Sequence, residues 1–120
     1  METRHERWER IRPALQDFVE KLLPIYGAAL RSVILFGSYA RGEEREDSDI
    51  DLLLLVDMTD EDLRNLRPRL SMLRLELDAA MPFLDIQPVV VPLQRFQAWK
   101  DVHPFYQKIV EDGVSLYEAA

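Results

Sequence analysis

Apolar side chains recur every three or four residues over the first part of the chain. The stripe is made of Trp8, Ile11, Leu15, Phe18, Leu22 and Ile25. This spacing is typical of an amphipathic helix that packs one face on a core. We expect Pro13 to kink this helix or to begin a second piece. Pro24 with Gly27 should mark the end of the helix.

Three continuous apolar runs further along the chain predict short buried strands. The first two are Val33–Phe36 and Ile50 with Leu52–Val56. The third is Phe83–Val91, in which Pro88 places the later part at a sheet edge or in a bulge. A last short strand is expected at Val114–Tyr117.

A second helical stripe separates the second and third predicted strands. It is made of Leu63, Leu66, Leu70, Leu73 and Leu77. Thr59 followed by Asp62 predicts its start, as a weaker form of the capping box. Pro68 should bend this segment or start a second helix, and Pro82 should stop it. Two short helices are expected later, at 93–100 and 104–111.

This order of elements predicts an α/β (α+β) fold in which helices flank a small mixed sheet. The chain has 120 residues and no linker rich enough to divide it, so one domain over residues 1–120 is the simplest organisation. No apolar run approaches the roughly 18 residues of a membrane span, and the first residues are charged. We therefore expect a cytoplasmic protein with no membrane partner.

Composition removes several kinds of chemistry. The chain has no cysteine, which excludes disulfides, thiolate metal sites and a thiol nucleophile. Its formal charge of −7 argues against direct binding of nucleic-acid phosphates. Six acidic residues fall between positions 43 and 51, opposed only by Arg45. The part of this segment from Glu43 to Asp47 is expected to be a solvated loop.

Asp49 and Asp51 interrupt the start of the second apolar run. Residues at i and i+2 of a strand share one face, so the two carboxylates should project together. Repulsion and lost hydration make this arrangement unfavourable unless a cation compensates for it. Asp85 also stands alone among apolar neighbours, either as a third ligand or paired with an arginine. An oxygen-rich cluster of this kind favours Mg²⁺ together with substrate phosphates.

The turn between the first two strands supplies candidate phosphate ligands. Gly37 lets the backbone approach a phosphate closely. Ser38 could cap the short helix that follows, donate to a phosphate oxygen, or do both. Arg41 could bind the same phosphates or form an ion pair with the acidic loop. Together these residues favour metal-assisted transfer from a nucleoside triphosphate.

The same residues carry a family resemblance. Gly37-Ser38, ten intervening residues and then Asp49-Ile50-Asp51 resemble the signature of the polymerase-beta-type nucleotidyltransferase superfamily. The form LFGSYARG…SDIDLLL is especially similar to its minimal branch, the MntA-like proteins. The resemblance implies that Asp49, Asp51 and Asp85 are the metal-binding catalytic residues for two Mg²⁺ ions. It also implies that Gly37 and Ser38 hold the triphosphate of ATP.

The resemblance further implies a protein partner. MntA-like proteins are typically encoded beside a HEPN-domain, HepT-like ribonuclease toxin. They act as its type VII antitoxin by transferring AMP from ATP to a tyrosine. Two alternatives stay open. The chain could modify a small molecule, as related aminoglycoside nucleotidyltransferases do, although no acceptor-binding domain is visible. It could also neutralise a partner by binding alone, with the carboxylates as a structural metal site.

Overall fold

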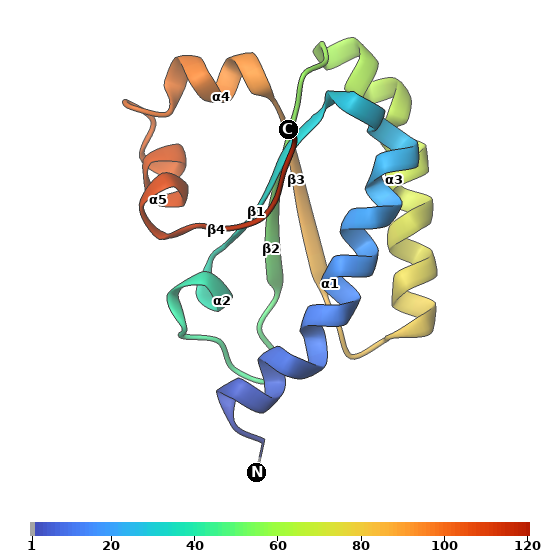
Figure 1. Cartoon of the computed structure of the whole chain (residues 1–120), viewed down its shortest axis with the longest axis vertical. Helices are drawn as coiled ribbons and strands as arrows, with labels where there is room; N and C mark the ends of the chain where they lie inside the picture. The colour runs from blue at the N-terminus through green and yellow to red at the C-terminus, as the bar shows by residue number, and fades with distance from the viewer. Residues whose placement is uncertain (1) are drawn as a thin grey trace.

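The structure, a computed structural model, describes residues 2–120. Figure 1 shows its helices and strands. In chain order they are α1 (Arg4–Tyr26), the 3₁₀ turn η1 (Gly27–Ala29), β1 (Leu30–Phe36), α2 (Ser38–Arg41), β2 (Ile50–Val56), α3 (Asp60–Ala80), β3 (Ile86–Pro92), α4 (Leu93–Trp99), α5 (Pro104–Asp112) and β4 (Val114–Glu118). The predicted cap is present, because Thr59 Oγ1 accepts a hydrogen bond of 3.1 Å from the Asp62 backbone N–H at the start of α3.

The four strands form one sheet in the order β3-β2-β1-β4. Strand β1 is antiparallel to both β2 and β4, whereas β3 runs parallel to β2. The parallel pair needs a crossover, and α3 provides it. The sheet is therefore mixed, with helices packed against it, so the predicted fold class is confirmed (Figure 1).

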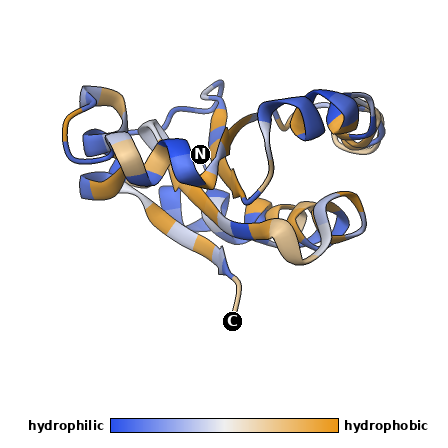
Figure 2. Cartoon of the chain, turned by 90° about the horizontal axis from the view of Figure 1, so that it is seen from above, coloured by the Kyte–Doolittle hydropathy of each residue, from blue (hydrophilic) through white to orange (hydrophobic). Residues whose placement is uncertain are grey.

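Alternate residues of β2 face opposite sides of the sheet. The side chains of 50, 52, 54 and 56 belong to the core with α1 and α3, whereas Leu53 and Leu55 pack with α4 and α5. Figures 1 and 2 show these two helix pairs on opposite sides of the sheet. Burial of a leucine side chain contributes roughly 1.5–3 kcal/mol, so this strand is firmly fixed. The same alternation directs Asp51 to the side of α4 and α5.

Two prolines do not divide their helices. Helix α1 continues through Pro13, and α3 continues through Pro68. The prediction that a second piece starts at either proline is wrong. Each proline removes one backbone donor, but apolar residues on both sides of Pro13 belong to the same core, among them Ile11 and Leu15. That shared burial holds the two halves of the helix in line.

The third strand begins later than predicted, at Ile86 rather than Phe83. Residues 82 and 83 form a turn, and Asp85 precedes the strand. Pro88 does lie on an edge strand, as predicted. The Ile50 backbone N–H donates to the Asp85 carbonyl over 2.8 Å. Residues two apart in a strand direct their backbone groups to the same side, so residues 85 and 87 both face β2. The backbone nitrogen of residue 88 therefore faces the outer edge of the sheet, where its missing N–H costs no hydrogen bond between strands.

Among residues 2–120, no helix is both long enough and apolar enough to cross a membrane.

Candidate active site

The strand register brings Asp51 beside the Gly37 turn. Asp51 in β2 pairs with Phe36, the last residue of β1, and Gly37 follows directly. Gly37 has φ of 75°, a conformation that favours glycine. A β-carbon at this position would overlap with Oδ2 of Asp51 and lie 3.2 Å from its Cγ. The absence of a side chain at residue 37 therefore leaves the space that the Asp51 carboxylate occupies.

Asp49 and Asp85 meet where β2 and β3 begin. Their chain segments are joined by the bond from the Ile50 N–H to the Asp85 carbonyl. A hydrogen bond with Asp85 raises the pKa of Asp49, and the negative charges of Asp85 and Asp51 act in the same direction. Two carboxyl groups can share such a bond only when one carries a proton. A bound cation would remove this need for a proton.

Asp51 is half-buried, and its environment opposes ionisation. Loss of hydration is the largest effect that raises the pKa of Asp51, and the charge of Asp85 adds to it. The positive charge of Arg41 acts in the opposite direction. The three predicted carboxylates therefore influence one another electrostatically, although only Asp51 lies in a strand and the other two precede β2 and β3.

Asp85 differs from its prediction in one respect. It is exposed and lies just before β3, so it is not a carboxylate enclosed among apolar neighbours within a strand. Its partner is Gln87 rather than an arginine: Nε2 of Gln87 donates to Oδ1 of Asp85 over 2.5 Å. Sequence reasoning missed Gln87, although its position two residues after Asp85 placed it on the same side of the strand.

The three carboxylates are the kind of ligand that a hard divalent cation prefers, but their side chains do not surround one common position. Among the described residues, no three His, Asp or Glu side chains are arranged around a common metal position. Oxygen donors are nevertheless the ligands that Mg²⁺ prefers, and substrate phosphates often complete its coordination. The mutual repulsion that raises the pKa of Asp49 is also what a cation would relieve.

The residues after Gly37 form α2, which is one turn long. Gly37 itself occupies the N-cap, and Ser38 is the first helical residue without a capping hydrogen bond from its side chain. The prediction that Ser38 caps this helix is therefore wrong. Arg41 makes the predicted ion pair with the acidic loop, from Nε to Oε2 of Glu43 over 3.2 Å. Its role as a phosphate ligand stays a prediction.

The acidic loop is anchored more firmly than predicted. The Glu44 side chain is only 5% exposed, and its Oε2 lies 3.6 Å from Nε of Arg4. The buried Arg7 donates from Nη1 to the Glu44 carbonyl over 3.4 Å. The prediction of a solvated loop is thus wrong for the Glu44 side chain. Helix α1 holds one end of the segment that leads to Asp49.

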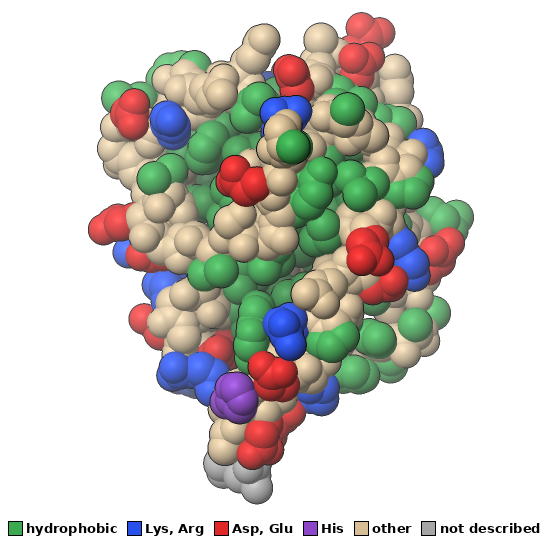
Figure 3. Space-filling model, in the orientation of Figure 1, with side chains coloured by type: hydrophobic (Ala, Val, Ile, Leu, Met, Phe, Trp, Pro, Cys, Tyr) green, Lys and Arg blue, Asp and Glu red, His purple; other side chains and the backbone are tan. Residues whose placement is uncertain are grey.

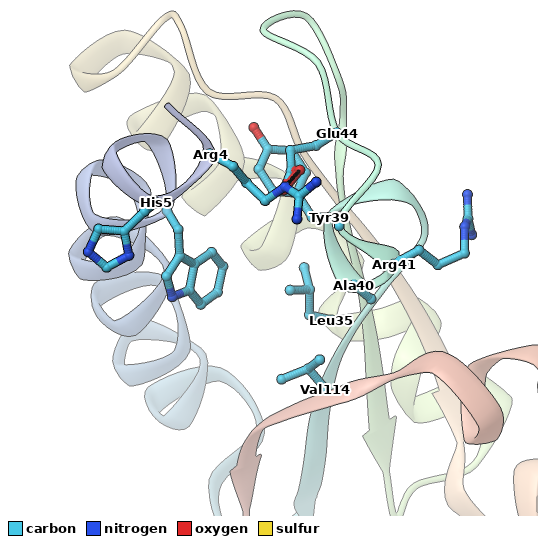
Figure 4. Close-up of a pocket in the computed structure, with 10 residues that line it drawn as sticks. Arg4, His5, Leu35, Tyr39, Ala40, Arg41, Glu44 and Val114 are labelled. Atoms are coloured by element: carbon cyan, nitrogen blue, oxygen red, sulfur yellow. Dashed lines mark ion pairs between the residues drawn. The ribbon is translucent and has the colours of Figure 1, made fainter. Parts of the chain in front are cut away.

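A hollow of about 730 Å³ lies on the α1 side of α2. Its walls include Arg4, Trp8 and Tyr39, and Figure 4 shows the Arg4–Glu44 pair at its upper rim. The Arg41 side chain points away from these residues in the same view. This hollow is lined by α1, α2 and neighbouring strands, whereas Asp51 lies on the sheet side that α4 and α5 cover.

Charges of both signs are interspersed over the face that Figure 3 shows, with hydrophobic side chains between them. This face of the molecule is therefore not uniformly acidic.

A comparison with protein-family models identifies the family of this chain. The model described as polymerase beta, nucleotidyltransferase matches residues 20–120, which include the Gly37 turn and all three predicted carboxylates. The chain belongs to this nucleotidyltransferase family. The family prediction made from the Gly-Ser and Asp-Ile-Asp residues is confirmed.

Related proteins carry names consistent with that family. One from Methanocaldococcus jannaschii, provisionally named a protein adenylyltransferase, is 47% identical over 45 residues, which are 38% of this chain and 45% of that protein. Another from the same organism, with the same provisional name, is 31% identical over 110 residues, or 87% of this chain and 69% of that protein. The chain thus spans less than half of the first relative and about two thirds of the second.

Solved structures share the fold at low sequence identity. A crystal structure from Sulfolobus solfataricus, provisionally described as a nucleotidyltransferase, is 21% identical, has a TM-score of 0.60 and covers 98% of this chain and 89% of its own. A toxin-antitoxin crystallised with AMP-PNP is 22% identical, with a TM-score of 0.51, and covers 86% and 73%. A mutant of the toxin-antitoxin MntA-HpeT is 24% identical, with a TM-score of 0.51, and covers 86% and 72%.

Proposed function

We propose that this chain transfers AMP from ATP to a tyrosine of a HEPN-domain, HepT-like toxin and thereby acts as its antitoxin. The observation that carries the proposal is the contact between Gly37 and the Asp51 carboxylate, next to the segments of Asp49 and Asp85 that the Ile50 N–H to Asp85 carbonyl bond holds together. The provisional names of the relatives and the toxin-antitoxin neighbours support the choice of a protein acceptor.

Each residue has a proposed task. Asp49, Asp51 and Asp85 hold two Mg²⁺ ions, and Gly37, Ser38 and Arg41 bind the phosphates. When bound, Mg²⁺ would neutralise phosphate charge and help to orient the reacting groups. The half-burial of Asp51 suits this task, because weak competition from water strengthens its interaction with a cation.

The proposed reaction is a displacement at the α-phosphorus of ATP. The tyrosine oxygen forms a bond to that phosphorus while the bond to the oxygen bridging the α- and β-phosphates breaks. Pyrophosphate leaves with the bonding electron pair, and the tyrosine keeps the AMP group as a phosphodiester. The phenolic proton passes to a carboxylate. We assign Asp85 to this step because it is exposed and so accessible to an acceptor.

The test uses the full chain, the HEPN-domain protein encoded beside it, Mg²⁺ and ATP labelled at the α-phosphate. Label should appear on the HEPN protein and disappear with Asp49→Asn and Asp51→Asn. ATP labelled at the γ-phosphate is the matched control and should leave the protein unlabelled, because that phosphate departs with pyrophosphate. A Tyr→Phe change at the modified position of the partner should also abolish the label.

The same experiment separates the two alternatives. Label on an added aminoglycoside, with none on the HEPN protein, would replace the protein acceptor with a small molecule. Full neutralisation of the toxin by the Asp49→Asn, Asp51→Asn double variant, without label on either acceptor, would leave binding alone as the antitoxin mechanism.

A further inference from the structure

Helix α5 presents one line of side chains to the end of β1. Phe105, Lys108, Ile109 and Asp112 are spaced by three and four residues, so they share one helical face. Ile109 is buried in the core with α4 and β2. The Phe105 ring meets the Phe36 ring edge-on, with 5.6 Å between their centroids. These two contacts fix α5 to the last residue before Gly37.

A small cavity of about 210 Å³ lies between this helix face and the Gly37 turn. Gly37 and Arg41 line it from one side, and Lys108 and Asp112 line it from α5. Whole ligands of drug size usually occupy about 300–1,000 Å³. The cavity therefore suits the phosphate end of a nucleotide better than a complete nucleotide. Residues of both α2 and α5 line this cavity, and Figure 1 shows the two helices to the left of β2.

Two cations approach this cavity from different elements. Arg41 comes from α2, and the ammonium of Lys108 comes from α5. The Lys108 Nζ lies 3.0 Å from Oδ2 of Asp112. The Asp112 side chain is 23% exposed and that of Lys108 is 59% exposed. The better buried carboxylate thus holds the lysine near the cavity while leaving it accessible to an incoming anion.

We propose that Lys108 binds the terminal phosphates of the nucleoside triphosphate across the cavity from Arg41, and that Asp112 positions it. This inference rests on the proposed nucleotidyltransferase function. An ammonium is a point charge with three rotatable donors, so it can follow a phosphate group that changes position. In the proposed reaction the terminal phosphates leave as pyrophosphate, and the ammonium offsets their negative charge.

The structure offers a matched control for an ordinary surface ion pair. Lys21 pairs with Asp17 on α1 with the same four-residue separation, a distance of 2.9 Å and 56% exposure of the lysine side chain. A pair of this kind contributes only about 0.3–0.5 kcal/mol to stability. If Lys108 were merely such a pair, Lys108→Met and Lys21→Met would have the same effects.

The experiment measures equilibrium binding of AMP and of an ATP analogue that cannot be cleaved between its α- and β-phosphates, both with Mg²⁺. Lys108→Met should lower the affinity for the triphosphate by about tenfold or more, because a charge-assisted bond to the terminal phosphates is lost. The affinity for AMP should stay unchanged. Lys21→Met should change neither affinity. Lys108→Arg should restore part of the triphosphate affinity.

Asp112→Asn tests the positioning role separately. Asp112→Asn should lower the affinity for the triphosphate less than Lys108→Met does. It should have no further effect on that affinity in the Lys108→Met background. A general structural role would lower AMP binding as well. Equal triphosphate affinity of wild type and Lys108→Met overturns this inference while the proposed function stands. A wild-type protein that binds neither nucleotide overturns the proposed function, and this inference with it.

Discussion

The α-carbon of Gly37 lies so close to the Asp51 carboxylate that a β-carbon there would overlap with Oδ2. The two residues belong to neighbouring elements: Gly37 follows β1, and Asp51 is the second residue of β2. The turn that should receive the phosphates and the strand that should hold the metal are thus built against each other. A change at either residue should be felt at the other.

Gly37→Ala should destabilise the protein and abolish nucleotide transfer. The new side chain must adopt φ of 75°, which costs about 1–3 kcal/mol, and must also displace the Asp51 carboxylate. The free energy of unfolding should therefore fall by more than the backbone cost alone. Thermal and urea unfolding would measure the loss.

Gly27→Ala is the matched control for this prediction. Gly27 has φ of 60°, but a β-carbon there has no neighbouring atom within 4 Å among the described residues. Its ψ of −143° is close to the −154° of Gly37, so Gly27→Ala should carry a similar backbone cost of about 1–3 kcal/mol without the overlap. Combining Gly37→Ala with Asp51→Ala should cost less than the sum of the single changes, because the overlap is relieved. Strict additivity would contradict the proposed contact.

The part of the site that lies on β2 could be predicted because its causes are local. The period of two along a strand decides which residues share a face, and an apolar run fixes the strand itself. The acidic pair Asp49 and Asp51 could therefore be located from their spacing. The Gly-Ser turn was recognisable for the same reason, since the need for glycine arises from the backbone at one residue.

Other features could not be predicted because they depend on distant contacts. The burial of Glu44 results from its meeting Arg4 and Arg7, which lie nearly forty positions earlier in the chain. Nothing in the residues around Glu44 distinguishes it from its exposed neighbours. Likewise, the local chemistry of Pro68 predicts a break in the helix, but α3 continues through it, and Leu70 and Leu73 beyond it are buried in the core.

The role proposed for Lys108 could not be predicted from the sequence for the same reason. Its local pattern with Asp112 is that of any surface pair on a helix. Its place opposite Gly37 arises only because α5 packs on Phe36 through Phe105. A site assembled from two elements about 70 residues apart leaves no spacing signal in the sequence.

Asp51→Asn should make the protein more stable at neutral pH in the presence of a chelator. Burial raises the pKa of Asp51 above its usual 3.8, so the folded state binds this proton more tightly than the unfolded state does. The resulting stabilisation is present below the unfolded pKa and is lost as the pH rises through the folded pKa. The variant avoids that loss, so its Tm at pH 7 should be higher than that of the wild type.

The Tm measured at low pH is the internal control for this prediction. Below about pH 3 the Asp51 carboxyl is protonated in both states, so the Tm of the variant should equal that of the wild type. A gain in Tm of the same size at all pH values would instead indicate a packing effect of the amide.

Gln87→Leu should slow transfer without unfolding the protein. The change removes the donor that holds Oδ1 of Asp85 and leaves the carboxylate free to rotate. We expect the rate to fall by about tenfold, as is usual when the partner of a metal-binding side chain is lost. Gln107→Leu is the control, because the Gln107 amide also donates over 2.5 Å, but to the carbonyl of Asp101 in the turn between α4 and α5. A similar loss of rate in both variants would argue against the positioning of Asp85.

Millimolar Mg²⁺ should raise the Tm of the wild-type protein at neutral pH more than sodium chloride of the same ionic strength does. The cation relieves the repulsion from neighbouring carboxylates that helps to raise the pKa of Asp49. At tenfold excess over its Kd, a ligand that binds only the folded state contributes about 1.4 kcal/mol. The rise should vanish in the Asp49→Asn, Asp51→Asn double variant and fade as the pH drops and the carboxyls take up protons.

Glu46→Gln removes an exposed charge from the same acidic segment and should leave the rise in Tm intact. If Glu46→Gln abolished the rise as fully as the double variant, Mg²⁺ would be acting on the general charge of the segment rather than on the three carboxylates.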